Sequence, residues 1–325
     1  MEKFLITGGQ GCIGAWITRQ LLAEGIDFTL VDLEPNEFIL QQVLDSDDIP
    51  SIERIYGDIS ASEFTQGLVA QTDATHIIHL AGLQIPTCRT NPVLGAQVNV
   101  VGTINIFEAA RLSEGQIQSV TYASSAAVVG PAEDYDGPIL DDAPHRPRTH
   151  YGYFKLANEG NARVYWQDFG IPSAGLRPYA VYGIGRELGL SSAPSRAIRA
   201  AVAGRPFKIP FSGPCGYNLV RDTAAQLIAC ARNVKEGAWG VNLPGTIADM
   251  AEVLKHIEAA VPEAAGSITF EGDTLPFACE IDTTNLGRLA PETPDTPLAD
   301  GIKETADLYR DLYARGVLDP AKAAD

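Results

Sequence analysis

Short apolar runs alternate with longer amphipathic stretches through the first half of the chain. A run such as THIIHLAG (75–82) is apolar at nearly every position, which is typical of a parallel strand buried on both faces of a sheet. The longer stretches carry apolar residues at helical spacing. This alternation predicts an α/β fold in which helices cover both faces of a doubly wound parallel sheet. The expected strands are 3–7, 27–32, 51–57, 75–82, 117–125 and 173–178, and the expected helices are 11–24, 62–71, 92–111 and 149–169.

The pattern loosens after residue 178, where glycine and proline become frequent. The segment AWGVNLPG (238–245) predicts one more strand, which returns to the sheet near 238–243. We expect a first domain over 1–178 and a smaller, mostly helical lobe over 179–325 packed against it, because no linker separates the two. The helical patterns of this lobe are 194–203, 222–233, 247–261 and 297–315.

The composition is ordinary for a globular protein but strongly acidic. The 325 residues include 41 Asp and Glu against 24 Lys and Arg, for a net charge of −17 without a basic patch. We therefore expect neither nucleic acid nor an anionic membrane as a partner. The five cysteines have no C-x-x-C spacing, no apolar run reaches the length of a membrane span, and the opening run is too short for a signal peptide. These features predict free thiols and a cytoplasmic location.

A glycine-rich turn, TGGQGCIG (7–14), follows the first expected strand. Glycines spaced in this way permit a tight turn, close approach of the backbone to a pyrophosphate and close packing of helix on strand, while the helix N-terminus offers free N–H groups. Asp32 ends the second strand, eighteen residues after the last of these glycines, where a carboxylate accepts hydrogen bonds from an adenosine ribose. The pattern predicts a Rossmann-type dinucleotide site. The residues expected at the turn are Gly8, Gly11, Cys12, Ile13 and Gly14.

The residues after Asp32 indicate which dinucleotide binds. The segment LEPNE (33–37) adds two carboxylates, and the first cation that follows is Arg54. A 2′-phosphate would face these carboxylates without a counter-ion, whereas a free 2′-hydroxyl gains a strong acceptor. We therefore expect the cofactor to be NAD.

A tyrosine and a lysine stand four residues apart where a helix is expected to begin. HYGYFK (150–155) puts Tyr151 and Lys155 on one helix face, and a cation beside a phenol lowers its pKa toward neutral pH. A phenolate can take the proton of an alcohol while hydride leaves the carbon. Taken alone, the same spacing also occurs in ordinary surface helices. Ser124 and Ser125 stand at the C-terminal end of the fifth expected strand, at the sheet edge where ligands bind, and a hydroxyl there can hold the reacting oxygen.

In order and separation, these segments resemble the extended short-chain dehydrogenase/reductase family, the NAD-dependent epimerase/dehydratase group, along most of the chain. The resemblance implies a bound NAD, a catalytic serine at Ser125, a general base at Tyr151, and a lysine at Lys155 that also contacts the nicotinamide ribose. The motifs that carry it are TGGQGCIG (7–14), Asp32, GDI (57–59), HLAG (79–82), NVVGTINIFEAAR (99–111), YASSAAVVG (122–130), YGYFK (151–155) and LRPYAVYG (176–183). It further implies Asp58 and Ile59 beside the adenine, Ala81 and Gly82 along the ribose and phosphates, Pro178 to Val181 over the nicotinamide, and Leu80 and Asn99 among the other cofactor contacts.

The family also points to a homodimer, and two expected helices carry apolar faces that favour one. These are 92–111 and 149–169, which together hold more apolar surface than one face of a sheet would cover. The alternative is that all of these residues belong to the core. They are Val98, Val101, Ile104, Phe107, Phe154, Val164, Tyr165 and Phe169.

The resemblance thins at the substrate. Nucleotide-sugar epimerases of this group carry an Asn and an Arg that grip the substrate diphosphate, and Ala180 and Cys215 stand at the matching positions. Neither can pair with a buried diphosphate, so a small substrate without a nucleotide is favoured. Among the possible anchors, Arg186 is expected close to the reactive end of the cofactor, where it could hold a carboxylate. The candidates are Gln84, Arg89, Ser125, Ala126, Arg186, Arg196 and Arg199, and the histidines suggest no metal site.

Three interpretations of function stay open. The first is an NAD-dependent dehydrogenase that oxidises a secondary alcohol of a small sugar-like or hydroxy-acid substrate. The second is an NAD-dependent sugar 4-epimerase, which shares the first half-reaction but keeps its NAD bound. The third is a catalytically silent NAD-binding protein, against which the intact set of Ser125, Tyr151 and Lys155 argues.

Overall fold

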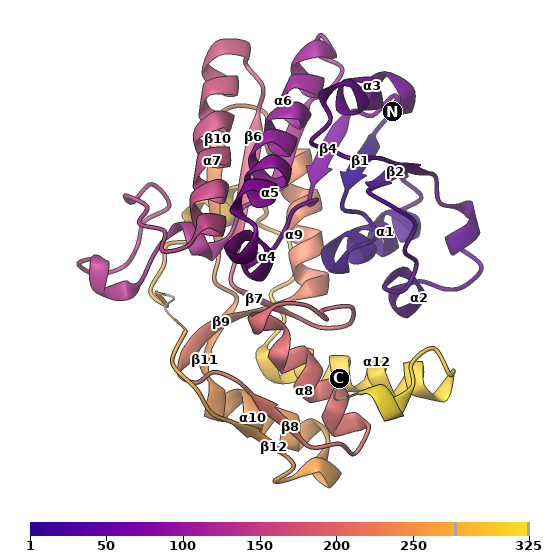
Figure 1. Ribbon diagram of the computed structural model, residues 1–325, viewed down its shortest axis with the longest axis vertical. Coiled ribbons are helices and arrows are strands. Elements are labelled where there is room, and N and C mark those ends of the chain that lie inside the picture. Colours follow the sequence, from indigo (N-terminus) through magenta and orange to yellow (C-terminus); the bar gives the residue numbers. More distant parts are fainter. Residues whose placement is uncertain (276–277, 324–325) are drawn as a thin grey trace.

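Seven parallel strands form the central sheet of the computed structural model, which describes residues 1–275 and 278–323 (Figure 1). Their order is β10-β6-β5-β4-β1-β2-β3, so the direction of winding reverses between β1 and β4, where open α/β sheets bind their ligands. The strands are β1 Lys3–Thr7, β2 Asp27–Asp32, β3 Arg54–Tyr56, β4 His76–His79, β5 Ser119–Ala123, β6 Ser173–Pro178 and β10 Ala238–Leu243. The expected doubly wound sheet is confirmed, although β3 is shorter than predicted because Ile49–Ser51 forms a 3-10 turn before it.

The faces of the sheet are covered by separate sets of helices. Along β1, Phe4 and Ile6 pack with the apolar residues of α1 and α9, whereas Leu5 packs with those of α3 and α6. This alternation follows from the two-residue repeat of a strand and gives each face its own core. Strand β10 therefore belongs to the central sheet, and helix α9 covers one face of it, although both follow residue 178. The covering helices are α1 Cys12–Glu24, α9 Val220–Asn233, α3 Ser62–Thr72, α6 Gly102–Leu112 and α7 His150–Phe169, with a short α2 at Leu40–Val43.

The helix that contains α6 is longer and less regular than α6 itself. It begins as α5 (Pro92–Ala96), continues through a π-helical segment at Gln97–Val101 and runs on as α6. By length and by its mean hydropathy of 1.2 it is apolar enough to cross a membrane, but half of that stretch is buried inside the protein. It contacts α3 and α7, as the core helix of a globular protein does. Phe107, which the sequence suggested as part of a dimer face, is fully buried in this core.

The second lobe contains small sheets that the sequence analysis missed. A three-stranded sheet has the order β11-β9-β7, and β12 pairs with β8. The segment predicted as a helix over 247–261 begins instead as β11, and Asp249 then caps α10 by accepting from the Ala251 N–H. The strands are β7 Ala180–Tyr182, β8 Phe207–Ile209, β9 Pro214–Leu219, β11 Thr246–Asp249 and β12 Ile268–Phe270. The helices are α8 Ala193–Val202, α10 Met250–Ala260, α11 Thr284–Leu289 and α12 Leu298–Ala314, while α4 (Ile85–Thr90) belongs to the first lobe.

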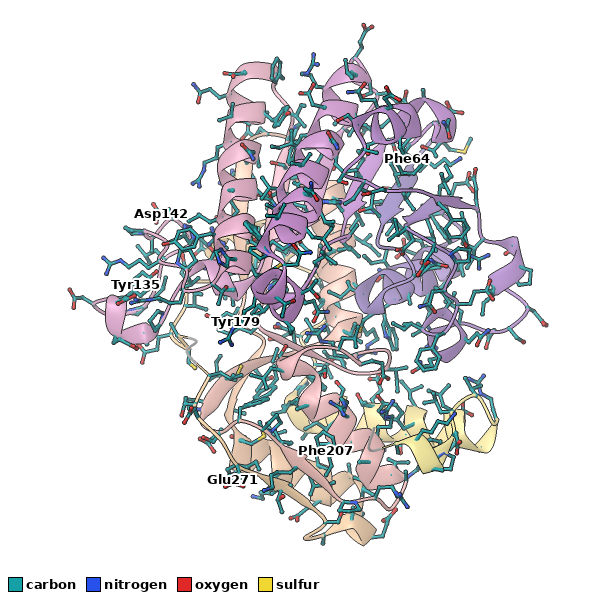
Figure 2. All side chains as sticks on the ribbon, in the orientation of Figure 1. Phe64, Tyr135, Asp142, Tyr179, Phe207 and Glu271 are labelled. Atoms are coloured by element: carbon teal, nitrogen blue, oxygen red, sulfur yellow. The ribbon has the colours of Figure 1, made fainter. Side chains whose placement is uncertain are left out.

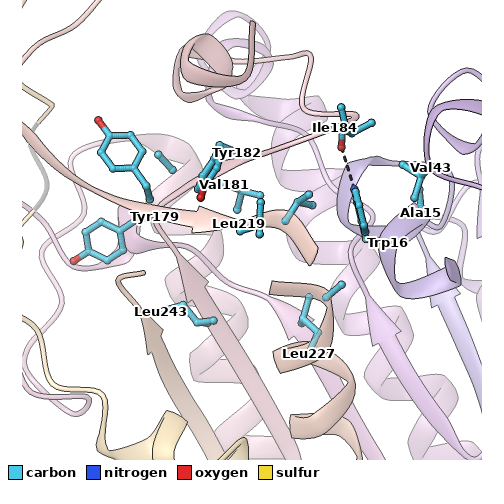
Figure 3. Close-up of a cluster of buried hydrophobic side chains, with 14 of the residues drawn as sticks. Ala15, Trp16, Val43, Tyr179, Val181, Tyr182, Ile184, Leu219, Leu227 and Leu243 are labelled. Carbon is cyan, nitrogen blue, oxygen red and sulfur yellow. Dashed lines mark hydrogen bonds between the residues drawn. The ribbon is translucent and has the colours of Figure 1, made fainter. Parts of the chain in front are cut away.

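The two lobes meet where the second begins. The indole Nε1 of Trp16, on α1, donates to the carbonyl of Ile184 at 3.1 Å, and both side chains are buried (Figure 3). The thiol of Cys12 approaches the same carbonyl at 3.7 Å. The segment after β7 is therefore held against the start of α1, at the carboxyl edge of the sheet.

Candidate active site

The turn between β1 and α1 requires glycine at two of its positions. Gly8 has φ +69°, and a Cβ there would lie 2.7 Å from the Ala81 nitrogen; a Cβ on Gly14 would lie 2.6 Å from the Gly8 carbonyl oxygen. Gly11 begins α1 without a side-chain cap, so the first N–H groups of the helix, on Cys12 and Ile13, have no side-chain acceptor. These free donors at a helix N-terminus fit a pyrophosphate.

Asp32 lies beside this turn, at the end of β2. Its carboxylate accepts from the backbone N–H groups of Gln10 at 3.0 Å and Leu33 at 3.1 Å, which fixes it toward the glycine turn with lone pairs left for ribose hydroxyls. The first cation beyond it, Arg54, donates to the Ile49 carbonyl at 2.7 Å and lies 3.4 Å from the Glu37 carboxylate. Because Arg54 is already paired, a 2′-phosphate would find no ready counter-ion here. The donor set therefore fits NAD.

Other residues expected at the cofactor lie along the same edge. Asp58 follows β3 and accepts from the Ser60 N–H at 2.8 Å, while Ile59 is buried against Gly102. Leu80, Ala81 and Gly82 follow β4, and Pro178 and Val181 flank the end of β6. Asn99, which was expected to contact the cofactor, bonds to a neighbouring loop in the structure. It is buried in the π-helical segment, and its side chain bonds to both the N–H and the carbonyl of Leu83, so it holds the loop after β4 in place.

Helix α7 brings the catalytic candidates together. Thr149 caps it by accepting from the Gly152 N–H at 3.0 Å, so that Tyr151 falls in the first turn. Gly152 packs tightly against the serine loop, since a Cβ there would lie 2.4 Å from the Ala127 carbonyl oxygen. Lys155 Nζ donates to the Ala123 carbonyl at 2.7 Å, at the end of β5, and lies 5.6 Å from the centre of the Tyr151 ring.

The two serines after β5 face different partners. The Ser125 hydroxyl lies close enough to Tyr151 to lower the pKa of the phenol, and it accepts from the Ala127 N–H at 3.2 Å. Ser124 is buried and donates to Glu159 at 2.5 Å. Ala126, expected at the substrate, has its side chain buried in the core. The structure thus brings Ser125 to Tyr151 and turns Ser124 away from it.

The ionisation of the pair differs from the simple expectation. Burial raises the pKa of the Tyr151 phenol above its ordinary value, and it outweighs the hydrogen bond from Ser125 and the positive charge of Arg186, both of which lower it. Burial also lowers the pKa of Lys155 to about 8. The sequence suggested that Lys155 lowers the phenol pKa; in the structure its ammonium is directed at the Ala123 carbonyl, and Ser125 and Arg186 are the groups that favour the phenolate.

A buried ion pair beneath the site was missed by the sequence analysis. Glu159 follows Lys155 by one helical turn and receives two hydrogen bonds from Arg177, whose guanidinium also donates to the Asp141 carbonyl and the Asn242 side chain. These bonds join α7, β6 and β10 directly under the Ser124 hydroxyl. The one available signal was a glutamate four residues after Lys155, on the same face of the helix.

The candidate substrate anchors separate clearly in the structure. Arg199 pairs with Glu187 at 2.7 Å, and Arg196 lies over the ring of Phe207. Phe207 belongs to the second lobe (Figure 2). Arg89 is exposed on α4. Gln84 and Arg186 come together from opposite lobes, with the Gln84 amide oxygen 3.1 Å from Arg186 Nη1 when the amide is oriented by its neighbours. Ala180 and Cys215, which the resemblance matches to the diphosphate-binding positions of the epimerases, are fully buried.

Comparison with known proteins gives the family and the fold. A family described as the NAD dependent epimerase/dehydratase family matches residues 4–239. The UDP-glucose 4-epimerase of Mycolicibacterium smegmatis is 28% identical, covering 95% of this chain and 98% of the relative. Among solved structures, UDP-glucose 4-epimerase of Thermotoga maritima with UDP-glucose has a TM-score of 0.82 at 17% identity, covering 96% and 99% of the two chains. The L-threonine dehydrogenase of Clostridium difficile also has a TM-score of 0.82, at 20% identity, covering 98% and 99%.

Proposed function

The chain belongs to the NAD-dependent epimerase/dehydratase family, and we propose that within it the protein oxidises a secondary alcohol of a small sugar-like or hydroxy-acid substrate, with NAD as the oxidant. The observation that carries the proposal is the placement of Ser125 beside Tyr151, with Lys155 on the same helix face, 5.6 Å from the centre of the Tyr151 ring and bonded to the Ala123 carbonyl at 2.7 Å. Three such groups at the carboxyl edge of the sheet are what an alcohol oxidation requires, and a silent NAD-binding protein has no use for them.

The residues divide the chemistry as follows. NAD, when bound, supplies the acceptor for the hydride that leaves the carbinol carbon. The Tyr151 phenolate takes the hydroxyl proton as the carbon–oxygen double bond forms, and Ser125 holds the same oxygen in place. The hydrogen bond from Ser125 and the charge of Arg186 favour the phenolate against the effect of burial. Lys155 would hold the ribose of the cofactor beneath them.

Two buried positions support a small substrate. Ala180 pairs with Tyr217 inside the small sheet, Cys215 pairs with Ala248, and neither side chain has any exposed surface. They therefore offer no donor to a diphosphate, which favours a compact molecule. The L-threonine dehydrogenase that shares this fold acts, by its name, on a substrate of that size.

A sugar 4-epimerase is the second candidate. It is favoured by the 28% identity to the M. smegmatis epimerase over nearly the whole length of both chains. The two activities differ in what happens to the cofactor, because an epimerase returns the hydride to the same carbon. Purified epimerase would therefore carry NAD that does not exchange with added NAD, whereas a dehydrogenase would release NADH on each turnover.

The proposal is tested by NAD reduction, followed at 340 nm, against polyols, aldoses, sugar acids and L-threonine. Tyr151→Phe removes only the phenol oxygen and should lower kcat by roughly a hundred- to ten-thousandfold while NAD still binds. Tyr153→Phe is the matched control, because Tyr153 is exposed on the same helix and should leave the rate unchanged. Retention of most of the activity by Tyr151→Phe would overturn the proposal.

We also propose that the protein works as a cytoplasmic homodimer. Cys12, Cys88, Cys215 and Cys230 are free thiols in the structure, which suits a reducing compartment. Val101 on the π-helical segment and Val164 and Phe169 on α7 are exposed, and they form the apolar surface that a partner would cover.

A further inference from the structure

Arg186 is an arginine without a carboxylate partner in an acidic protein. Its Nη2 donates to the Ser191 hydroxyl at 3.0 Å, and its Nη1 lies 3.1 Å from the amide oxygen of Gln84. Its Nε is buried and has no acceptor. Among the described residues, no Asp or Glu lies within salt-bridge distance of it, and the neighbouring Glu187 pairs with Arg199 instead. A half-buried guanidinium held only by neutral groups is poised to receive an anion.

The fold places this guanidinium at the mouth of the site. Ile184 is fixed to α1 by Trp16, and a Cβ on Gly185 would lie 3.8 Å from the Cα of Cys12, so the segment that carries Arg186 runs past the start of α1. From the other lobe, the Gln84 amide nitrogen donates to the Leu188 carbonyl at 3.3 Å. The same charge is close enough to Tyr151 to lower the pKa of the phenol. Arg186 therefore lies between the cofactor turn and the general base.

The surroundings of Arg186 suit a planar anion. Gly189 has φ +86°. A Cβ at this position would lie 2.5 Å from the end of the Gln84 side chain and 3.9 Å from Arg186 Nη2, so a larger residue would collide with Gln84. Ser191 and Gln84 fix the guanidinium from two sides and leave its other N–H groups unpaired. A fixed fork of N–H donors matches the two oxygens of a carboxylate, which an ammonium group would not do.

We propose that Arg186, positioned by Gln84 and Ser191, binds a carboxylate of the substrate, so that the substrate is a hydroxy acid or sugar acid rather than a neutral sugar. This inference rests on the proposed function and names the substrate class of the same site. The other anion within reach is the cofactor pyrophosphate, because Arg186 lies beside the start of α1. Experiments must therefore separate the two.

The test compares matched pairs of compounds on the NAD-loaded protein: D-gluconate with D-glucitol, D-galacturonate with D-galactose, and D-glycerate with glycerol. Binding is measured by calorimetry and turnover by NADH formation. We expect at least one acid to bind and its neutral partner to bind at least tenfold more weakly. Arg186→Met should raise the Kd for that acid by about tenfold or more, since a hydrogen bond to a charged group is lost. It should leave the Kd for NAD unchanged.

Two further variants guard against misfolding as an explanation. Gln84→Glu leaves Arg186 in place but sets a carboxylate beside it. Because this carboxylate competes with the substrate for Arg186, it should raise the Kd for the acid as Arg186→Met does. Arg205→Met, which removes an exposed arginine elsewhere on the second lobe, should change nothing. A loss of NAD affinity in Arg186→Met with acid binding intact would assign the cation to the cofactor and overturn the inference. Equal binding of acids and neutral partners, or turnover of neutral sugars alone, would also overturn it while the proposed function stands.

Discussion

The Glu159 carboxylate accepts hydrogen bonds from Nε of Arg177 at 2.9 Å and from Nη2 at 2.7 Å, and neither side chain is more than 4% exposed. The carboxylate holds its charge there because Arg177 and the Ser124 hydroxyl keep its pKa below the ordinary value against the effect of burial. The pair therefore ties α7, which carries Tyr151 and Lys155, to the strands beneath the serine loop. The attraction between the two ions is largely offset by the cost of taking both out of water. The pair therefore matters to stability mainly when one partner is removed and the other is left buried and unpaired.

Glu159→Gln should destabilise the protein strongly, by about 3–5 kcal/mol, because Arg177 is left buried without its counter-ion. The double variant Glu159→Leu with Arg177→Met leaves no unpaired charge and should cost less than the single change. Urea unfolding of both variants provides the measurement. A double variant less stable than Glu159→Gln would show that the pair contributes net stability rather than merely avoiding an unpaired ion.

Asp32→Asn should weaken NAD binding more than NADP binding, because the carboxylate accepts from ribose hydroxyls but repels a 2′-phosphate. Arg54 cannot compensate while it is paired with Glu37. The two dissociation constants, measured by calorimetry on both proteins, test this. Tighter binding of NADP than NAD by the unmodified protein would contradict the assignment.

His79 should make the protein sensitive to acid. It is buried between the hydroxyls of Thr7 and Thr103, and burial, helped by the charge of Lys155, lowers its pKa to about 3. The unfolded chain takes up a proton near pH 6.5 and the folded chain does not, so the free energy of unfolding falls as the pH falls below this value, by about 1.4 kcal/mol per pH unit. In His79→Gln, the unfolding free energy should change less steeply with pH between pH 6 and pH 4, by about 1.4 kcal/mol per pH unit, which corresponds to one proton. An unchanged slope would mean that His79 does not remain neutral in the fold.

UDP, UDP-glucose and UDP-galactose should not bind at micromolar concentration. The two positions that would grip the diphosphate hold Ala180 and Cys215, and each missing contact to a charged group weakens binding by about tenfold or more. Titration of each compound into the NAD-loaded protein checks this. Micromolar binding of any one of them would move the epimerase interpretation to the front.

Light scattering at micromolar concentration should give the mass of a dimer. Val164→Asp together with Phe169→Asp should give a monomer, because charge on an apolar interface must be desolvated on association. Ile247→Asp is the control, since Ile247 is exposed on β11 in the other lobe. A monomer in the unmodified protein would exclude the proposed assembly.

The sequence predicted those parts of the fold that depend on local patterns. The glycine turn, the strand ending at Asp32 and the start of α7 after its Thr149 cap each follow from the residue types at a few adjacent positions. The small sheets did not, because β7, β9 and β11 lie in a region rich in glycine and proline and are stabilised by pairing across long separations such as Ala180 with Tyr217, and because β7 and β11 are short. The same limit hid the contact between Gln84 and Arg186, which come from different lobes.

Trp16 gives the protein an internal optical probe. Its indole is fixed to the Ile184 carbonyl at the junction of the lobes, while Trp166 and Trp239 line a surface hollow between α7 and β10. With three tryptophans in the chain, replacing the latter two by phenylalanine leaves a single tryptophan, which lies beside the segment that carries Arg186. A shift in its emission on adding cofactor or acid would then record, in real time and without a label, a change in the surroundings of the indole at the junction of the lobes.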